Sequence, residues 1–287
     1  MDFSPAQVAW LRYFSALLAY CVAMLVLRGS GRVKGRVFLW PDRRSTAGLL
    51  LALGFLTFFF APLAQIIGLA DSQATDNVLI IAMEPLLTVL IAWVFIREKI
   101  TLFHGVAFGF ALFGFMLLAG ITPAGLARGW NPRLIGNLLI LFSLVGEGAY
   151  STLSRKLMER HPPLLIFGSS LVVGVFFLTL ALSHARGGGI GTLGARSFSA
   201  KNIFCLAWLG PLGTTATYLY WMLALAEAPI ASVALTLFVQ PLFGSIWGLV
   251  FLKDRLNLIQ AAGGALIFAA VSGLALKPLL NRLRTER

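Results

Sequence analysis

The chain has 287 residues, of which 59% are hydrophobic and only 12% are charged, against about 45–50% and about 25% in soluble domains. A soluble fold of this length could not bury so much apolar surface, so the composition predicts an integral membrane protein. The formal net charge of +12 would suggest a nucleic-acid partner in a soluble protein, but basic residues also gather in loops beside membrane helices, so no nucleic-acid partner is expected.

Nine apolar segments are each long enough to cross a bilayer, which takes about 20 residues per helix. In chain order they span residues 6–28, 46–70, 76–96, 101–121, 134–155, 163–184, 202–226, 231–252 and 257–277. Very short links join the third segment to the fourth and the eighth to the ninth, which predicts two antiparallel hairpins. The predicted fold class is therefore all-α, a polytopic bundle of membrane helices.

An internal repeat relates the two halves of the chain. The stretch EPLLTVLIAWVFIREKI at 84–100 matches QPLFGSIWGLVFLKDRL at 240–256 with an offset of 156, and both end in a charge triplet with the signs preserved. Five helices separate each segment from its copy, and five is odd, so the copies cross the membrane in opposite directions. Inverted repeats are typical of secondary transporters, in which one half rocks against the other.

The predicted domains follow this repeat: residues 1–121 form a first repeat of four helices, 134–277 a second of five, and 278–287 a basic tail. The segment 134–155 has no partner in the first half. With the link 29–45 placed inside, inside loops carry 15 basic residues and outside loops 7. The positive-inside rule then places Met1 outside and the C-terminus in the cytoplasm. We expect the protein in the plasma membrane, as a bacterial inner-membrane protein. We expect that a first helix upstream of Met1 is missing.

Each half carries a Pro-containing helix, an acidic residue in a short turn and a Gly/Ala-rich final helix. These are MEPLLTVLIAWVFIREKITLFHGVAFGFALFGF and VQPLFGSIWGLVFLKDRLNLIQAAGGALIFAAVSG. Together with VAWLRYFSALLAY and its Arg12, they resemble the EamA type of the drug/metabolite transporter superfamily over nearly the whole chain. The resemblance implies ten helices in two inverted five-helix repeats and export of small metabolites such as amino acids. This chain departs from that pattern by its absent first helix.

Ionisable groups inside a membrane usually face the bundle interior or a watery cavity. Glu147 lies about 20 Å along its helix at 1.5 Å per residue, on a polar face formed by Ser143, Glu147, Tyr150, Ser151 and Ser154. Its carboxylate could bind a substrate amine or take up a proton. Alternatively, hydroxyl groups satisfy it and it only holds helices together.

Glu84 directly precedes Pro85, and its equivalent in the repeat is Gln240. A proline leaves a backbone carbonyl unpaired and often marks a bend that lines a cavity. Glu84 is therefore a second candidate for substrate binding or proton coupling, with a structural role as the alternative. On the following helix, Gly105 and Gly109 form a small-residue face that predicts close helix packing.

Three further residues share one helical face: Phe58, Pro62 and Gln65. At the offset of 156 they correspond to Thr214, Tyr218 and Trp221. Aromatic, amide and hydroxyl groups of this kind could line a mixed pocket, with Gln240 as a further lining residue. Ordinary helix packing is the alternative.

The leading functional prediction is a secondary carrier that exports small organic metabolites, most of all amino acids, by alternating access. A cationic drug would suit Glu147 near Tyr218 and Trp221, whereas a nucleotide-linked sugar would call for basic residues that only Arg12 approaches. A membrane-embedded enzyme is the distant alternative, because no nucleophile, base or metal-ligand set is clustered. We therefore predict no catalytic residues, metal or cofactor, and leave open proton coupling and a monomeric or homodimeric state.

Overall fold

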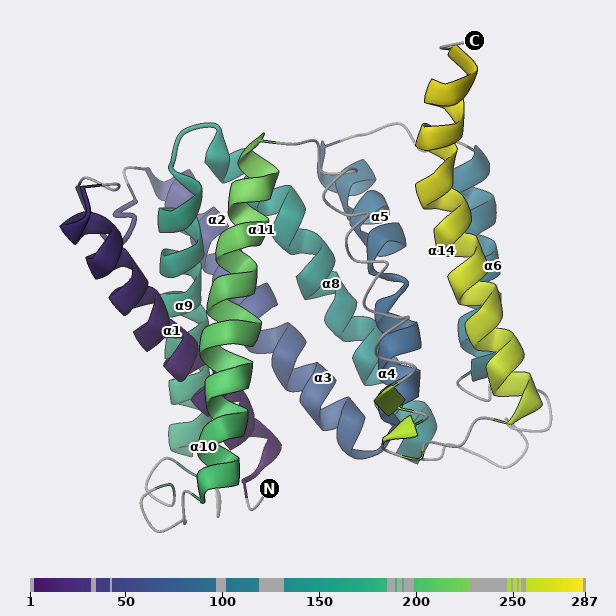
Figure 1. Cartoon of the computed structure of the whole chain (residues 1–287), viewed down its shortest axis with the longest axis horizontal. Helices are drawn as coiled ribbons and strands as arrows, with labels where there is room; N and C mark the ends of the chain where they lie inside the picture. The colour runs from purple at the N-terminus through teal and green to yellow at the C-terminus, as the bar shows by residue number, and fades with distance from the viewer. Residues whose placement is uncertain are drawn as a thin grey trace. The chain divides into compact units, whose positions relative to one another are not determined.

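The computed structural model describes residues 3–31, 35–41, 43–96, 102–118, 132–184, 189, 193, 199–227, 247–248, 250–251, 253 and 257–285. Within these ranges all regular secondary structure is helical (Figure 1). The elements are α1 (Pro5–Gly29), α2 (Arg44–Phe55), η1 (Leu56–Phe60), α3 (Ala61–Ala70), α4 (Ala74–Ile81), α5 (Glu84–Ile96), α6 (Leu102–Leu118), α8 (Pro132–Met158), α9 (Pro163–His184), α10 (Ala200–Ala207), η3 (Trp208–Ala216), α11 (Thr217–Glu227) and α14 (Leu258–Thr285). The predicted all-α class is confirmed.

Where the structure describes them, the apolar segments predicted from composition are helical, apart from a turn within 76–96 and one at the end of 231–252. Four helical stretches are long and apolar enough to cross a membrane by themselves: Pro5–Gly29, Arg44–Ala70, Pro132–Met158 and Pro163–His184. The predicted segment 231–252 lies outside the described residues except at its C-terminal end. Residues 278–285, expected as part of a basic tail, continue α14 as helix.

Two of the predicted helices contain π-helical turns. The stretch from α2 to α3 includes η1, which lies just before Pro62, and the stretch from α10 to α11 includes η3, which contains Pro211. Proline lacks the N–H that would continue the ladder, and π turns are a common response. In η3 the Thr214 hydroxyl also donates to Leu209 O, five residues earlier, at 2.8 Å, so a side chain adds a hydrogen bond to this irregular stretch.

The predicted helix 76–96 is broken in two. Helix α4 ends at Ile81 and α5 begins at Glu84, with a turn at Ala82 and Met83 between them. Pro85 cannot donate to the carbonyl of Ile81, and its ring would clash with that carbonyl in a continuous helix. The Met83 N–H instead bonds Ile80 O at 2.9 Å, and Met83 O accepts from Leu86 N at 3.0 Å. The bend expected from Pro85 is thus a full interruption.

The chain divides into two compact units, and each draws helices from both halves of the sequence. The first unit comprises Met1–Leu63 and Tyr150–Ala228, and the second comprises Ala64–Ala149 and Pro229–Arg287. Helix α3 and helix α8 each contribute residues to both units.

The first unit is built around α9, against which α1 and α2 pack. Figure 1 shows α1 and α9 running in opposite directions. Glycines allow large rings to sit against this helix, because a Cβ at Gly168 would overlap the ring of Tyr20 and a Cβ at Gly174 would overlap Phe58. The Tyr20 hydroxyl lies 2.7 Å from Val37 O, so it also ties the link after α1 to the bundle.

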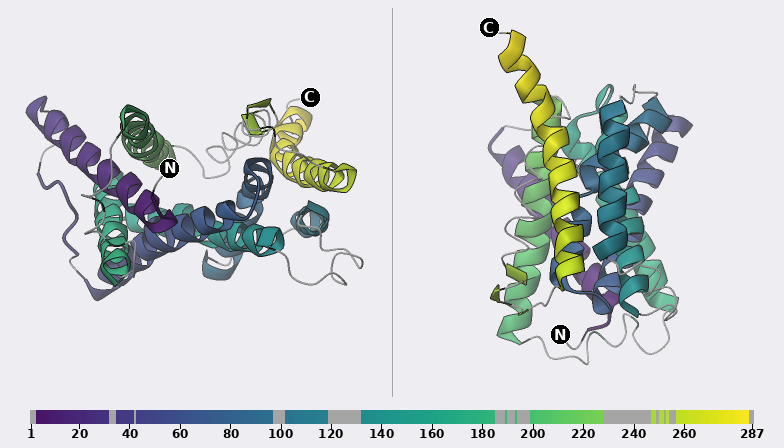
Figure 2. Two further views of the ribbon diagram at one scale, coloured as in Figure 1. Left: turned by 90° about the horizontal axis from the view of Figure 1, so that it is seen from below. Right: turned by 90° about the vertical axis from the view of Figure 1, so that its right-hand side faces the viewer.

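The second unit contains α4, α5, α6, α14 and the first part of α8. Helices α6 and α14 lie side by side and antiparallel (Figures 1 and 2). They meet at Gly114 and Gly263, whose backbones approach so closely that a Cβ on Gly114 would lie 2.6 Å from Gly263 O. The apolar core of this unit includes Ile80, Phe115 and Ile140, each almost completely buried.

The helix starts follow the predicted repeat. Helix α2 begins at Arg44 and α10 at Ala200, while α6 begins at Leu102 and α14 at Leu258. Both pairs are 156 residues apart, the offset found in the sequence. The π-helical segment η1 also maps onto residues 212–216 within η3 at that offset.

Candidate functional site

The two membrane carboxylates singled out in the sequence are neighbours in the second unit. Glu84 is the first residue of α5, because the helix restarts there after the turn at Ala82 and Met83. Glu147 lies within the long helix α8. Both side chains are partly buried.

Glycine brings α8 close to α5 at this level. A Cβ built on Gly148 would lie 3.2 Å from both the backbone nitrogen and the hydroxyl oxygen of Thr88, and 3.0 Å from Ile91 Cδ1. Thr88 is one helical turn after Glu84, and Gly148 follows Glu147 directly. The close contact between the two helices therefore coincides with the two carboxylates.

Two carboxylates near each other in an apolar bundle are unfavourable unless a positive charge accompanies them. Like charges repel strongly where water is scarce, and a cation bound between the carboxylates relieves that repulsion. A substrate ammonium group and a proton are both suitable cations.

The rest of the predicted polar face of α8 is buried. Ser143 is buried, and its hydroxyl donates to Ile140 O of the same helix at 2.7 Å, so its proton is not directed at Glu147. Ser151 and Ser154 are buried. Tyr150 is also buried, and its ring belongs to an aromatic cluster of the first unit. Glu147 and Tyr150, although one helical turn apart, thus belong to different compact units.

The aromatic cluster joins several residues predicted to line a pocket. Phe58 is fully buried, and its ring centroid lies 5.8 Å from that of Tyr150 and 5.1 Å from that of Tyr218. Tyr150 and Tyr218 are 5.0 Å apart in an edge-to-face arrangement. Phe167 stacks on Tyr218 at 5.6 Å. The pairing of Phe58 with Tyr218 brings together the two helices that the repeat relates.

The other predicted pocket residues lie in varied surroundings. Thr214 is fully buried and accepts a hydrogen bond from Arg12 Nε at 3.0 Å. Pro62 is buried and Trp221 is half-buried, both in the first unit, whereas Gln65 is half-buried in the second. Gln240 lies outside the described residues.

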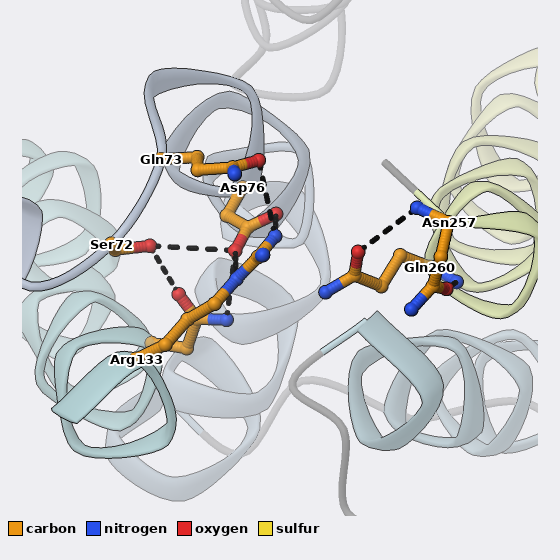
Figure 3. Close-up of polar contacts among 7 residues, drawn as sticks. Ser72, Gln73, Asp76, Arg133, Asn257 and Gln260 are labelled. Carbon is orange, nitrogen blue, oxygen red and sulfur yellow. Dashed lines mark hydrogen bonds and ion pairs between the residues drawn. The ribbon is translucent and has the colours of Figure 1, made fainter. Parts of the chain in front are cut away.

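Sequence reasoning missed a buried ion pair in the second unit. Arg133, near the start of α8, bonds both carboxylate oxygens of Asp76 on α4, at 2.8 and 2.9 Å (Figure 3). Asp76 is completely buried, and Asn137 donates to it at 3.1 Å. The sequence did contain a pattern that could have predicted this pair. Polar residues are spaced four apart at the ends of two apolar segments, Ser72 with Asp76 and Arg133 with Asn137.

In the described part of the chain, no three His, Cys, Asp or Glu residues are grouped so that they could hold a metal ion. The polar residues shown to the right in Figure 3 have a local role. Asn257 and Gln260 exchange backbone-to-side-chain hydrogen bonds of 3.1 and 2.8 Å that cap the start of α14.

Comparison with known proteins identifies relatives along nearly the entire chain. The EamA-like transporter family matches residues 1–120 and 134–276. An uncharacterized transporter of Archaeoglobus fulgidus is 21% identical over 93% of this chain and 87% of its own length. A WAT1-related chloroplastic protein of Arabidopsis thaliana is 23% identical over 90% of this chain and 61% of its own.

Two further similarities concern substrate and fold. A probable terminal-alkyne amino-acid exporter of Streptantibioticus cattleyicolor is 26% identical over 67% of this chain and 61% of its own length. One protein of known crystal structure superposes with a TM-score of 0.63 at 16% identity, covering 94% of this chain and 87% of that chain. At that identity the likeness is one of fold.

Proposed function

The chain belongs to the EamA-like transporter family, and from this premise we propose that it is a secondary carrier that exports small organic metabolites, amino acids first among them. Membership of the family makes it an integral membrane transporter, with a small molecule as its substrate and the lipid bilayer as its surroundings. The relatives named above are transporters or related membrane proteins rather than enzymes.

The observation that carries the choice of substrate is the pair formed by Glu84 and Glu147. An amino acid presents an ammonium group, and a charge-assisted contact to a carboxylate is the strongest interaction that a small polar molecule can make in a dry site. A proton can occupy the same pair when substrate has left, which would couple export to the proton gradient. The amino-acid exporter among the relatives supports this substrate class.

Alternating access between inverted repeats is supported by the matching helix starts and by the opposed directions of related helices. Helices α1 and α9 run in opposite directions, and so do α6 and α14 (Figure 1). Two copies in opposite orientations give a pathway that can open to either side of the membrane. We propose residues 1–121 and 134–277 as the two repeats, with Met1 on the outer side of a bacterial inner membrane.

Counterflow in proteoliposomes tests the proposal. Vesicles loaded with unlabelled amino acids are expected to accumulate labelled tracer with the wild type, and Glu147→Gln and Glu84→Gln should each lower the initial rate at least tenfold. Glu159→Gln is the matched control, because Glu159 is exposed just beyond the end of α8 and its loss should leave the rate unchanged. Equal rates in all four proteins would refute the role of the pair. The absence of wild-type exchange for every amino acid would refute the substrate class.

The aromatic cluster favours a second candidate, a carrier of hydrophobic cations. The faces of Phe58, Tyr150 and Tyr218 are electron-rich surfaces of the kind that bind quaternary ammonium groups. Competition distinguishes the two candidates. Inhibition of tracer counterflow by tetraphenylphosphonium but not by any amino acid would replace the first proposal with the second.

A further inference from the structure

The buried ion pair of the second unit joins two segments that also carry the candidate cation site. Asp76 lies on α4, eight residues before Glu84, and Arg133 lies on α8, fourteen residues before Glu147. Arg133 also bonds Gln73 at 3.2 Å, and Asn137 receives a short hydrogen bond from Ser72. Figure 3 shows these groups converging from the turn after α3, from α4 and from α8.

The geometry of this network fixes α8 along its axis. A bidentate arginine–carboxylate pair accepts only a narrow range of positions, because the planar guanidinium must meet both oxygens. Asn137, one turn further along α8, donates to the same carboxylate at 3.1 Å. Two successive turns of α8 are therefore held by one buried carboxylate, so that neither sliding nor rotation of the helix leaves both bonds intact.

Backbone packing reinforces this attachment. Gly136 of α8 crosses Gly68 of α3 so closely that a Cβ on either glycine would lie 2.5 Å from the carbonyl oxygen of the other. The next attachment along α8 is the contact of Gly148 with Thr88. Between these two levels α8 spans three turns, and a displacement at the first level is transmitted along the rigid helix to the second.

We propose that Asp76 and Arg133 are positioning residues for the carboxylate pair, holding α8 in the register at which Gly148 meets Thr88 and Glu147 lies near Glu84. The network of Ser72, Gln73, Asp76, Arg133 and Asn137 is here named the register clamp. The inference rests on the proposed function only where it concerns substrate affinity. The geometric part, that the clamp sets the separation of positions 84 and 147, stands independently of what the carrier moves.

Cross-linking tests the geometric part directly. In the full chain with Cys21 and Cys205 replaced by serine, Glu84→Cys and Glu147→Cys are joined by a short bifunctional methanethiosulfonate, and the rate is compared with and without Asp76→Asn. The variant is expected to slow cross-linking at least fivefold. Asp76→Asn suits this purpose because it leaves Arg133, which is 29% exposed, rather than a buried unpaired carboxylate. Asp71→Asn, an exposed acid of the same turn, is the control that should change nothing.

Transport kinetics test the functional part. With both carboxylates present, Asp76→Asn is expected to raise the KM for amino-acid counterflow about tenfold while the maximal rate changes little. Arg133→Lys keeps the charge but loses the bidentate geometry, and it should raise the KM in the same direction. In a Glu147→Asp background, where the carboxylate is already displaced, the effect of Asp76→Asn should shrink, because both changes act on one contact.

The outcomes separate this inference from the proposed function. Unchanged cross-linking in Asp76→Asn overturns the register clamp whatever the substrate is. Slower cross-linking in a protein that exchanges no amino acid supports the clamp and refutes the substrate class. A fall in maximal rate and folded yield with an unaltered KM would make the network structural only, and would overturn its positioning role.

Discussion

The close backbone approach of Gly114 and Gly263 gives a quantitative test of how α6 and α14 pack. Gly114→Ala would place a methyl group 2.6 Å from Gly263 O, whereas ordinary contacts begin near 3.4 Å. The helices would have to separate by about 0.8 Å, and the backbone carbonyl cannot rotate away as a side chain could. Overpacking of this kind costs about 1–3 kcal/mol, and helix contacts in membranes depend on such close packing.

A matched substitution on the same helix separates packing from helix propensity. No described atom lies within 4 Å of a Cβ built on Gly109, so Gly109→Ala should gain only the intrinsic preference of alanine over glycine, about 1 kcal/mol. Thermal unfolding of both variants in detergent is the assay. At roughly 2–4 °C per kcal/mol, Gly114→Ala should melt several degrees below Gly109→Ala. Equal melting temperatures would refute the reasoning.

Three further predictions follow from contacts of the first unit. Phe58→Ala should lower the melting temperature strongly, since replacing a buried Phe costs about 3–5 kcal/mol, whereas Phe176→Ala on the exposed face of α9 should cost far less; similar losses would contradict the cluster. Thr214→Val removes the partner of Arg12 and the donor to Leu209 O, for an expected loss of about 1–3 kcal/mol that the exposed Thr217→Val should not match in the same melting assay. Tyr20→Phe deletes the bond to Val37 O and should speed hydrogen exchange in residues 35–41, while Tyr220→Phe, exposed at 74%, should not; unaltered exchange in Tyr20→Phe would show that the link is held by other contacts.

The all-helical architecture could be predicted from the sequence because apolar length determines it. A run of about 20 apolar residues has to satisfy its own backbone hydrogen bonds within the bilayer. The interruption before Glu84 was also signalled, since proline lacks the donor that a continuous helix needs. The π-helical segments were not: in η3 and directly after it, the hydroxyls of Thr214 and Thr217 each bond a carbonyl five residues earlier, and such contacts depend on rotamers rather than on composition.

The packing glycines show why local spacing is a weak guide to contact. The sequence predicted a close face at Gly105 and Gly109, but no described atom lies within 4 Å of a Cβ on either. The close approach is at Gly114 and Gly263 instead. A spacing of four residues identifies a smooth face of one helix, whereas the partner and its register depend on the whole bundle.

The candidate site, too, could be predicted from the sequence only in part. Glu84 and Glu147 were each selected as candidates from the sequence because burying a charge is costly. Their proximity could not be predicted, because it depends on the position of α8 along α5. Asp76 and Arg133 were overlooked for a different reason. Both lie near the ends of apolar segments, where charged residues usually face water, and only the fold shows that the carboxylate of Asp76 is enclosed.

The break between α4 and α5 also bears on how the chain enters the membrane. Helix α4 has 8 residues and α5 has 13, which gives lengths of about 12 Å and about 20 Å at 1.5 Å per residue. Neither reaches across a hydrocarbon core of about 30 Å. Residues 74–96 together are long enough to cross it, so we expect the insertion machinery to accept them as a single span and the turn at Ala82 and Met83 to form once neighbouring helices are in place. Membrane insertion thus favours a continuous helix in residues 74–96, whereas the mature bundle contains a break in the same residues.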